Sequence, residues 1–418
     1  MKKSLNAEIL SVGTELLLGH VANTDARDLS ELLSRIGVNV KYHSVVGDNP
    51  ARLRECVEIA RGRADILITT GGLGPTCDDL TKQVLCDCFG KALVKNREED
   101  RALYEYIRTG RGLTPNTHRQ AWLPEGCTVF HNRWGTAPGC AFEAEGMHVL
   151  MLPGPPKECV PMFESCALPY LRRLSDETIV SHAVRIFGLG ESAVDDLFAD
   201  EMNRMINPSM APYAKECDCL LQITAKAGSE AEAEAMIAPV MARVKERLGE
   251  YVYGVDIECV EEAVMALLRE KPMSFATAES CTGGDIARRF TELPGASAFF
   301  KGGVVSYVNE IKEDLLGVSP AVLAEKTAVS REVAAAMAEG ARARLHADLA
   351  VSVTGLAGPD GDGVHEVGTV FIGLAAPERT CVRETRMGPY RTRSFIRRMA
   401  GNHAFDMLRR YLSGLPIL

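Results

Sequence analysis

A chain of 418 residues exceeds what one hydrophobic core usually supports, so we expect two or three domains. Apolar residues make up 46% and charged residues 25% of the chain, which excludes a disordered or fibrous protein, and a net charge of −9 argues against a nucleic-acid partner. No apolar run approaches the ~20 residues that cross a bilayer and no signal-peptide core follows Met1, so we expect a cytoplasmic protein without a membrane partner.

The first domain, expected over residues 1–173, alternates short Val- and Ile-rich runs with helical patterns. This alternation is typical of a doubly wound α/β domain in which helices cover a parallel sheet. Strands are predicted at Ala7–Val12, Val38–Val46, Asp65–Thr70 and His148–Leu152, and helices near Thr24–Ile36, Ala51–Arg61 and Asp79–Phe89.

Loops that follow these strands are candidate nucleotide-binding loops, because glycine and threonine backbones can wrap phosphate groups. The loop after the third strand ends in the paired acids Asp78 and Asp79, which could hold a divalent ion through their oxygens or simply cap a helix. The candidate nucleotide-binding residues are Gly13, Glu15, Asn23, Thr70, Gly71, Gly72, Gly74, Pro75, Thr76 and Gly154.

The second domain, expected over residues 174–256, is predicted as a small α+β unit. Its Gly188–Ser192 turn is a candidate anion site, but strand-to-helix geometry explains the glycines better. The predicted elements are a strand at Ala183–Phe187, a helix from Glu191, a strand at Leu220–Ala225 and a helix at Ala231–Leu248.

The third domain, expected over residues 257–418, is again α/β. Its predicted strands are Met273–Ala278, Gly303–Tyr307, Asp348–Thr354 and Thr369–Leu374. Helices are predicted near Val260–Arg269 and Thr392–Leu412, and further helices begin near Cys281, Glu310 and Ser330.

Two loops of the third domain, residues 279–284 and 354–360, follow apolar strands and contain glycines. At the carboxyl ends of strands such loops face one crevice, and a helix N-terminus there favours an anion. Cys281, placed at a helix N-terminus, is a candidate nucleophile with a lowered pKa. The candidate substrate-binding residues of the loops are Ser280, Thr282, Gly283, Gly284, Thr354, Gly355 and Gly358.

The order of the segments AESCTGG, GASAFF, VVSYVNEIK, VTGLAGPDG and VGTVFIGLA resembles that of CinA C-terminal domains, which deamidate nicotinamide mononucleotide. The resemblance implies a serine nucleophile at Ser297 assisted by Tyr307 and Lys312, without a cofactor, and it ranks Cys281 behind Ser297. A lysine can activate a serine when desolvation keeps its amine partly neutral.

Two further features of the last domain can be compared with the same family. Arg393 and Arg397, in the last helix, match the family's arginines and are candidate phosphate contacts. Relatives often carry a longer, lysine-containing stretch where this chain has Asp362–Glu366, and His365 within it is left without a role.

The loops of the first domain, with GTAPG at 135–139 and LPGPP at 152–156, resemble the molybdopterin-binding fold of the MoaB, MogA and MoeA kind found at the CinA N-terminus. That resemblance implies an ADP-ribose pyrophosphatase that depends on a divalent metal at Asp78 and Asp79. Relatives usually have Asn-Pro before GTAPG, whereas this chain has His131–Trp134.

We therefore expect a homo-oligomeric enzyme of pyridine-nucleotide salvage whose ligands are nicotinamide mononucleotide and ADP-ribose. One alternative is a binding protein linked to competence and DNA damage, without catalysis. Another is molybdopterin binding by the first domain, which rests on fold analogy.

Overall fold

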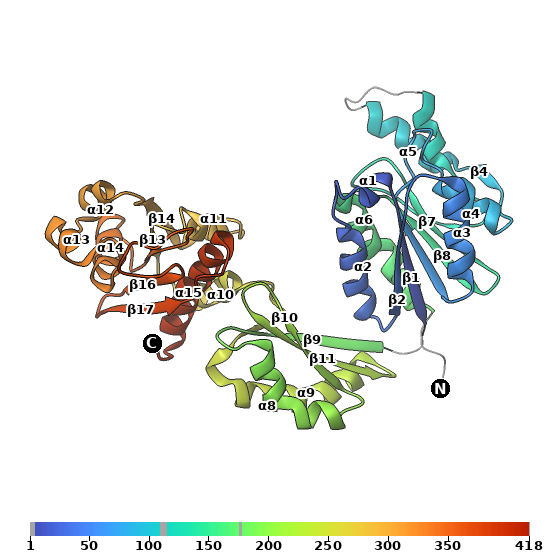
Figure 1. Ribbon diagram of the computed structural model, residues 1–418. Helices are drawn as coiled ribbons and strands as arrows, with labels where there is room; N and C mark the ends of the chain where they lie inside the picture. The colour runs from blue at the N-terminus through green and yellow to red at the C-terminus, as the bar shows by residue number, and fades with distance from the viewer. Residues whose placement is uncertain (1–4, 109–114, 175–177, 418) are drawn as a thin grey trace. The chain divides into compact units, whose positions relative to one another are not determined.

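The computed structural model describes residues 5–108, 115–174 and 178–417 (Figure 1). Contacts group the chain into two compact units, one holding residues 1–181 with 225–236 and the other residues 182–224 with 237–418. No helix in the described ranges is long and apolar enough to cross a membrane.

The first domain is built on a six-stranded sheet in the order β2-β1-β3-β8-β7-β6. The strands β2, β1, β3 and β8 run parallel, as predicted, and β7 and β6 add an antiparallel extension that was not predicted. The strands are β1 (Asn6–Val12), β2 (Asn39–Val46), β3 (Ile66–Thr70), β6 (Thr128–Phe130), β7 (Gly139–Ala144) and β8 (Met147–Leu152).

Helices cover both faces of this sheet, which makes the domain doubly wound. Leu29 of α2 (Thr24–Ser34) and Met162 of α6 (Pro156–Met162) lie in one buried cluster, and Leu53 of α3 (Pro50–Arg61) and Leu85 of α4 (Thr81–Cys88) lie in another. The remaining elements are α1 (Thr14–Leu17), β4 (Leu93–Lys95), α5 (Arg97–Arg108), β5 (Trp122–Pro124) and α7 (Leu168–Arg172).

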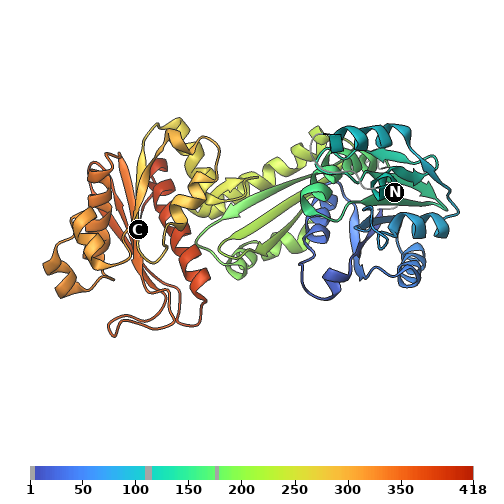
Figure 2. The ribbon, with the colours of Figure 1, turned by 90° about the horizontal axis from the view of Figure 1, so that it is seen from above.

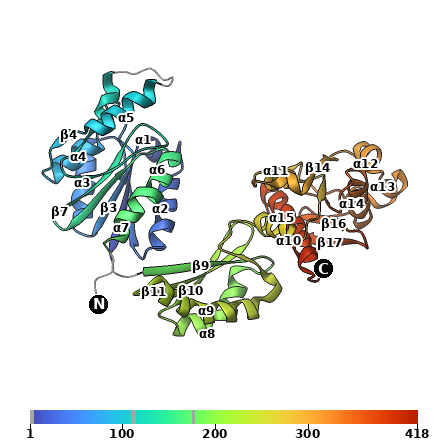
Figure 3. The same ribbon diagram turned by 180° about the vertical axis from the view of Figure 1, so that it is seen from behind.

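The middle domain is a four-stranded sheet in the order β10-β11-β9-β12, with two helices on one side (Figure 3). The long strand β11 alternates buried and half-buried residues, as expected for a strand that packs one face on helices. The elements are β9 (Thr178–Ile186), α8 (Glu191–Arg204), β10 (Ser209–Ala214), β11 (Cys219–Ala227), α9 (Glu230–Leu248) and β12 (Val252–Val255).

The last domain contains a five-stranded sheet in the order β14-β13-β15-β16-β17, covered on both faces (Figure 2). The strands are β13 (Phe275–Glu279), β14 (Phe300–Val305), β15 (Leu349–Gly355), β16 (Thr369–Ala375) and β17 (Thr380–Arg386). The helices are α10 (Val260–Glu270), α11 (Asp285–Thr291) and α15 (Arg393–Ser413) on one face, and α12 (Asn309–Leu316), α13 (Pro320–Lys326) and α14 (Arg331–Arg344) on the other.

Strand direction decides which loops of the last domain meet. Because β13, β14 and β15 are parallel, the segments that follow Glu279, Val305 and Gly355 leave the same edge of the sheet. The strand β17 also ends at this edge and leads into α15. We call this edge, with its loops and the first turn of α15, the carboxyl edge.

Candidate functional site

The carboxyl edge brings together Ser280, which follows β13, and Lys312, which lies in α12. The Lys312 side chain is buried, and its Nζ donates to Ser280 Oγ at 3.3 Å and to the Ser306 carbonyl at 2.7 Å. Burial lowers the pKa of Lys312 because desolvation disfavours the charged amine. A neutral amine beside a serine hydroxyl can accept the hydroxyl proton, so this pair has the parts of a serine–lysine nucleophile.

Two arginines of α15 tie the loops of this edge together. Arg393 donates to the Tyr307 hydroxyl at 2.9 Å and to the Gly358 carbonyl at 2.6 Å. Arg397 donates to the Thr282 carbonyl at 2.7 Å. The structure therefore places Tyr307, Gly358 and the 280–284 loop around two guanidinium groups, which suit a phosphate or another anion.

The backbone of the 280–284 loop depends on its glycines. Gly283 and Gly284 have φ angles of +62° and +91°, a left-handed region that favours glycine. The hydroxyls of Thr282 and Ser306 are buried and have no hydrogen-bond partner among the described residues. Both residues lie between Ser280 and Lys312 in the sequence, and their hydroxyls are unpaired polar groups near this edge within the described ranges.

The structure does not bring Ser297 to Tyr307 and Lys312 within one chain. Ser297 lies in a short turn at Ala296–Ala298, just before β14 begins beside Phe275, whereas Tyr307 follows the other end of that strand. A strand of 6 residues spans roughly 20 Å, so the predicted grouping of Ser297 with Lys312 is wrong for a single chain.

The predicted anion site at a helix N-terminus is already occupied by a side chain. The helix α11 begins at Asp285, later than the predicted start near Cys281. The carboxylate of Glu279, fully buried, accepts hydrogen bonds from the N–H groups of Ile286 at 3.1 Å and Ala287 at 3.0 Å. The Glu279 carboxylate therefore already supplies the negative charge that the first turn of α11 favours.

Cys281 does not have the environment of an activated thiol. The residue is buried, and burial raises the pKa of its thiol to about 12 despite the nearby Arg393 and Arg397. The predicted lowered pKa is therefore wrong, because Cys281 precedes α11 by four residues and is shielded from water.

Two loop residues proposed as substrate contacts have contacts within the protein. Thr354 is buried and its Oγ1 donates to the Ala328 carbonyl at 2.7 Å. A Cβ at Gly355 would lie 2.8 Å from the Thr369 carbonyl oxygen, so this glycine permits close strand packing. In the loop that departs from the family pattern, Asp362 accepts the N–H groups of Val364 and His365, which closes a tight turn.

The first domain has a pocket of about 480 Å³ at the carboxyl ends of its parallel strands. Two acidic residues of this lining, Asp48 and Glu158, were not predicted, since neither belongs to a glycine-rich motif. The predicted residues that line it are Gly13, Glu15, Gly71, Gly72, Gly74, Asp78, Asp79 and Gly154.

Other predicted residues of the first domain lie outside this lining. Asn23 caps α2 by accepting the Ala26 N–H at 3.3 Å and also donates to Ser11 Oγ at 3.1 Å. Thr70 Oγ1 donates to the same Ser11 hydroxyl at 3.2 Å. Pro75 precedes Thr76, which lines a second pocket of about 650 Å³ that shares Gly74 and Asp79 with the first.

The proposed metal residues fit an ion only in part. Asp79 accepts hydrogen bonds from Thr76 N at 2.8 Å and Thr76 Oγ1 at 2.5 Å, as a cap would. Across the described residues no three His, Cys, Asp or Glu side chains lie close enough to enclose a metal. Mg²⁺ commonly keeps its waters and uses one or two carboxylates plus phosphate oxygens, so Asp78 and Asp79 fit an ion that arrives with a phosphorylated ligand.

Lys82 is a buried cation of this region that the sequence analysis missed. It lines the second pocket, and its Nζ donates to the Gln120 carbonyl at 2.9 Å. Burial lowers the pKa of Lys82 to about 8. Its position three residues after Asp79, at the start of α4, was the available signal.

Models of three domain families match the chain: "Probable molybdopterin binding domain" over residues 8–173, "Damage-inducible protein CinA KH domain" over 181–254 and "CinA C-terminal domain" over 257–412. The chain is 45% identical to a protein named for competence-damage induction in Caldanaerobacter subterraneus, with 99% of this chain and 100% of that one covered. It is also 45% identical to a CinA-like protein of Desulfovibrio desulfuricans, with coverages of 99% and 97%.

A solved structure also matches part of the chain. It is the crystal structure of a competence/damage inducible protein from Agrobacterium tumefaciens, 38% identical, with 37% of this chain and 95% of that chain covered and a TM-score of 0.35. The domain matches agree with the α/β, small α+β and α/β architecture predicted from the sequence, and they specify the middle domain as KH-like.

Proposed function

Because this chain belongs to the CinA family, we propose that its last domain is an amidohydrolase that converts nicotinamide mononucleotide and water into nicotinate mononucleotide and ammonia. Family membership indicates an enzyme, and the substrate is the one implied by the resemblance of the motif order to CinA C-terminal domains. The observation that carries the proposed chemistry is the contact of Lys312 Nζ with Ser280 Oγ at 3.3 Å inside a buried environment.

In the proposed reaction, Ser280 Oγ attacks the carboxamide carbon while neutral Lys312 accepts the serine proton. Lys312 then gives this proton to the departing nitrogen, so that ammonia leaves and an ester remains on Ser280. Water hydrolyses the ester, with Lys312 again as the base. Arg393 and Arg397 would bind the phosphate of the substrate.

We propose Ser280 in place of Ser297 as the nucleophile. Ser280 contacts the buried amine, whereas Ser297 is exposed and lies at the other end of β14. A serine without a base is a weak nucleophile, so the position of Lys312 decides between the two serines.

The activity is tested by following ammonia and nicotinate mononucleotide together. The parent protein should release them in equal amounts from nicotinamide mononucleotide, without added cofactor. Lys312→Met should release neither product, because it lacks a base. Added mononucleotide should still stabilise this variant against unfolding, because the binding residues are unchanged. A parent protein that releases no ammonia and shows no mononucleotide binding would remove the proposal. A salt-dependent DNA complex at physiological ionic strength would then favour the non-catalytic alternative.

For the first domain we propose metal-dependent hydrolysis of ADP-ribose. The supporting observation is the pocket whose lining combines glycine backbone with Glu15, Asp48, Asp78 and Asp79. A divalent ion would offset the pyrophosphate charge and activate water there. The carboxylates would hold that ion through its waters, and the glycines at 71, 72 and 74 leave room for the phosphates.

Molybdopterin binding is the competing proposal for this pocket. Thermal unfolding with Mg²⁺ separates the two, because a specific ligand raises the melting temperature. ADP-ribose should raise it and be converted to AMP and ribose 5-phosphate. A rise with added pterin and none with ADP-ribose would favour the alternative.

A further inference from the structure

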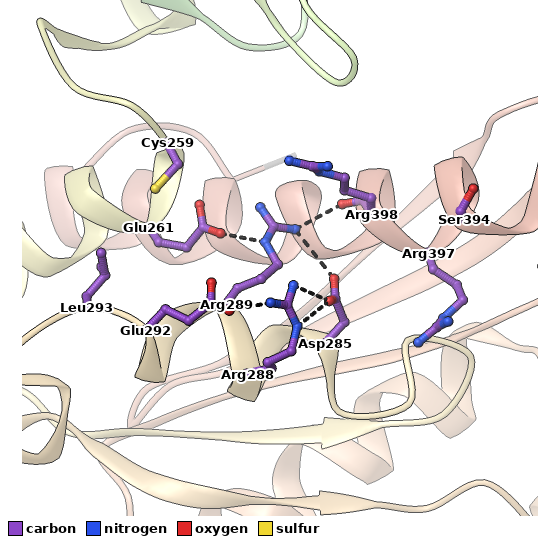
Figure 4. Close-up of a pocket in the computed structure, with 10 residues that line it drawn as sticks. All are labelled: Cys259, Glu261, Asp285, Arg288, Arg289, Glu292, Leu293, Ser394, Arg397 and Arg398. Atoms are coloured by element: carbon purple, nitrogen blue, oxygen red, sulfur yellow. Dashed lines mark hydrogen bonds and ion pairs between the residues drawn. The ribbon is translucent and has the colours of Figure 1, made fainter. Parts of the chain in front are cut away.

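A pocket of about 560 Å³ lies among α10, α11 and α15, and of its lining residues only Arg397 has a role in the reactions proposed above (Figure 4). Its volume falls within the roughly 300–1,000 Å³ of small-molecule sites. Charged side chains dominate its walls, which excludes a purely apolar ligand. The lining residues are Cys259, Glu261, Asp285, Arg288, Arg289, Glu292, Leu293, Ser394, Arg397 and Arg398.

Glu261 has an acceptor oxygen for which the described residues supply no stronger donor than the weak thiol of Cys259. Only 3% of the residue is exposed, and its Oε1 accepts from Arg289 Nε at 2.5 Å. Its Oε2 is buried and meets no donor of standard hydrogen-bond geometry in the described parts of the chain, although Cys259 lies nearby. A buried carboxylate oxygen without a donor is costly, so a ligand that supplies an N–H group there is favoured. Figure 4 shows this oxygen turned away from the Arg289 guanidinium.

The charge of Glu261 is already balanced, which limits the donor to a neutral group. The buried Arg289 guanidinium pairs with Glu261 and also donates to Asn402 Oδ1 at 2.5 Å. A second cation beside this pair would add repulsion from Arg289. An amino group on an aromatic ring, or an amide, donates without carrying a charge.

The opposite side of the pocket suits an anion. Arg397, Arg398 and Ser394 all come from the first turns of α15. Arg398 is largely exposed and uses one nitrogen on Glu216, at 2.8 Å, so other donors of its guanidinium remain. Arg288, in contrast, is matched by Asp285 and Glu292. The first turns of α15 thus supply guanidinium N–H groups and a hydroxyl, which are donors suited to a phosphate.

We infer that this pocket binds a nucleoside monophosphate whose base carries an amino group, with the phosphate at Arg397 and Arg398 and the amino N–H on Glu261 Oε2. Binding is linked to the carboxyl edge, because Arg397 also donates to the Thr282 carbonyl. A phosphate that draws Arg397 toward the pocket weakens that contact and changes the KM of the deamidation proposed above. Binding itself does not require that activity.

Calorimetry with the full chain and three probes tests the assignment. Adenosine 5′-monophosphate should bind. Purine riboside 5′-monophosphate, which lacks the amino group, and adenosine, which lacks the phosphate, should each bind at least about tenfold more weakly. Glu261→Gln keeps an oxygen for Arg289 but places an NH₂ group where Oε2 was, so it should weaken adenosine 5′-monophosphate at least about tenfold.

Glu270→Gln is the matched control, since Glu270 is an exposed residue at the end of the same helix and outside the pocket. It should bind the probe as the parent does, and near-ultraviolet circular dichroism should show both variants folded. The inference is overturned if the parent shows no heat with millimolar probe. It is also overturned if Glu261→Gln binds like the parent, or if Arg393→Ala alone abolishes binding, which would place the probe at the carboxyl edge.

Discussion

Lys312 illustrates how burial changes the proton affinity of an ordinary residue type. Its amine lies among Ser280 and two carbonyl oxygens, with no carboxylate among its hydrogen-bond partners. Desolvation therefore lowers its pKa and outweighs the opposing effect of the nearby Cys281. The amine becomes neutral at a lower pH than an exposed lysine, which is the property that the proposed reaction needs.

This property predicts a particular pH dependence. The kcat/KM of deamidation should rise with pH on the acid side as Lys312 loses its proton, with a midpoint below the pKa of a free lysine. Lys312→Arg cannot supply a neutral base and should lose roughly 10²–10⁴-fold in kcat/KM. A pH–rate profile of both proteins checks this, and an arginine variant that keeps the parent's rate would contradict it.

Asp25 gives a second prediction, on stability. It is buried in the first turn of α2, one of its oxygens has no partner among the described residues, and burial followed by Asp28 raises its pKa to about 6. The folded protein thus holds the proton more tightly than the unfolded chain, whose aspartate pKa is about 3.9. The stability from this group is complete below about pH 4 and is lost as the pH rises through 6.

Asp25→Asn should therefore unfold at higher urea concentration than the parent at pH 8, by up to about 3 kcal/mol in free energy. The gap should nearly close at pH 4, where Asp25 is protonated in the folded protein and about half protonated in the unfolded chain. Urea titrations at the two pH values measure the gap, and a gap of equal size at both would show that Asp25 is ionised throughout.

Residue types and spacing were enough to select the loops that meet at the carboxyl edge, because small hydroxyl residues and glycines after apolar strands are visible in the sequence. Residue types and spacing did not reveal the environment of each side chain. Cys281 and Ser280 are neighbours in sequence, yet the structure gives only Ser280 a basic partner. The role of Glu279 as the cap of α11 also depends on a side-chain direction that no sequence pattern encodes.

At the scale of elements, hydrogen bonds from α15 stabilise the second compact unit. Near its C-terminal end the buried Asp406 accepts hydrogen bonds from Arg383, Arg409 and Arg410. Arg409 also donates to the Glu250 carbonyl at 2.9 Å, which connects the helix to the middle domain. Burial disfavours ionisation, but Arg409 and Arg383 outweigh it and lower the pKa of Asp406.

Removing this charge should be costly. Asp406→Asn leaves three largely buried guanidinium groups with one fewer negative partner and should reduce the free energy of unfolding by about 3–5 kcal/mol. Glu384→Gln is the control, because its partner Arg386 is exposed and such pairs contribute at most about 1 kcal/mol. Urea unfolding at pH 7 compares the two, and equal midpoints would show that Asp406 is not needed.

The sequence predicted the central strands of each sheet well, since runs such as Ile66–Thr70 consist of aliphatic residues and threonines that favour a buried strand. The antiparallel strands at the sheet edges were harder to predict. β17 alternates with charged residues and β6 has only 3 residues, so neither gives a continuous apolar run. The position of Ser297 was missed for a related reason. The order of motifs along the chain does not show that the length of β14 separates Ser297 from Tyr307 and Lys312.

At the scale of the whole molecule, the two candidate sites lie in different contact units and share no residue. Asp79→Asn should therefore lower metal-dependent hydrolysis of ADP-ribose and leave the rate of nicotinamide mononucleotide deamidation within about twofold of the parent. Lys312→Arg should do the reverse. Assaying both reactions on both variants checks this, and a parallel loss of both activities would indicate coupled sites.

Domain order and family were accessible from the sequence because they depend on motifs that follow one another along the chain. The pocket among α10, α11 and α15 was not accessible in this way. Two of its key residues, Glu261 and Arg289, are 28 positions apart, and Arg398 lies 109 positions after Arg289 and joins them only through packing of the last helix.

The central claim is that the buried Lys312 activates Ser280 for amide hydrolysis. The most direct measurement is kcat/KM for ammonia release from nicotinamide mononucleotide by Ser280→Ala and Ser297→Ala, with circular dichroism to show that both are folded. Ser280→Ala should lose roughly a thousandfold or more, and Ser297→Ala should stay near the parent. Loss in Ser297→Ala with activity retained in Ser280→Ala would contradict the account.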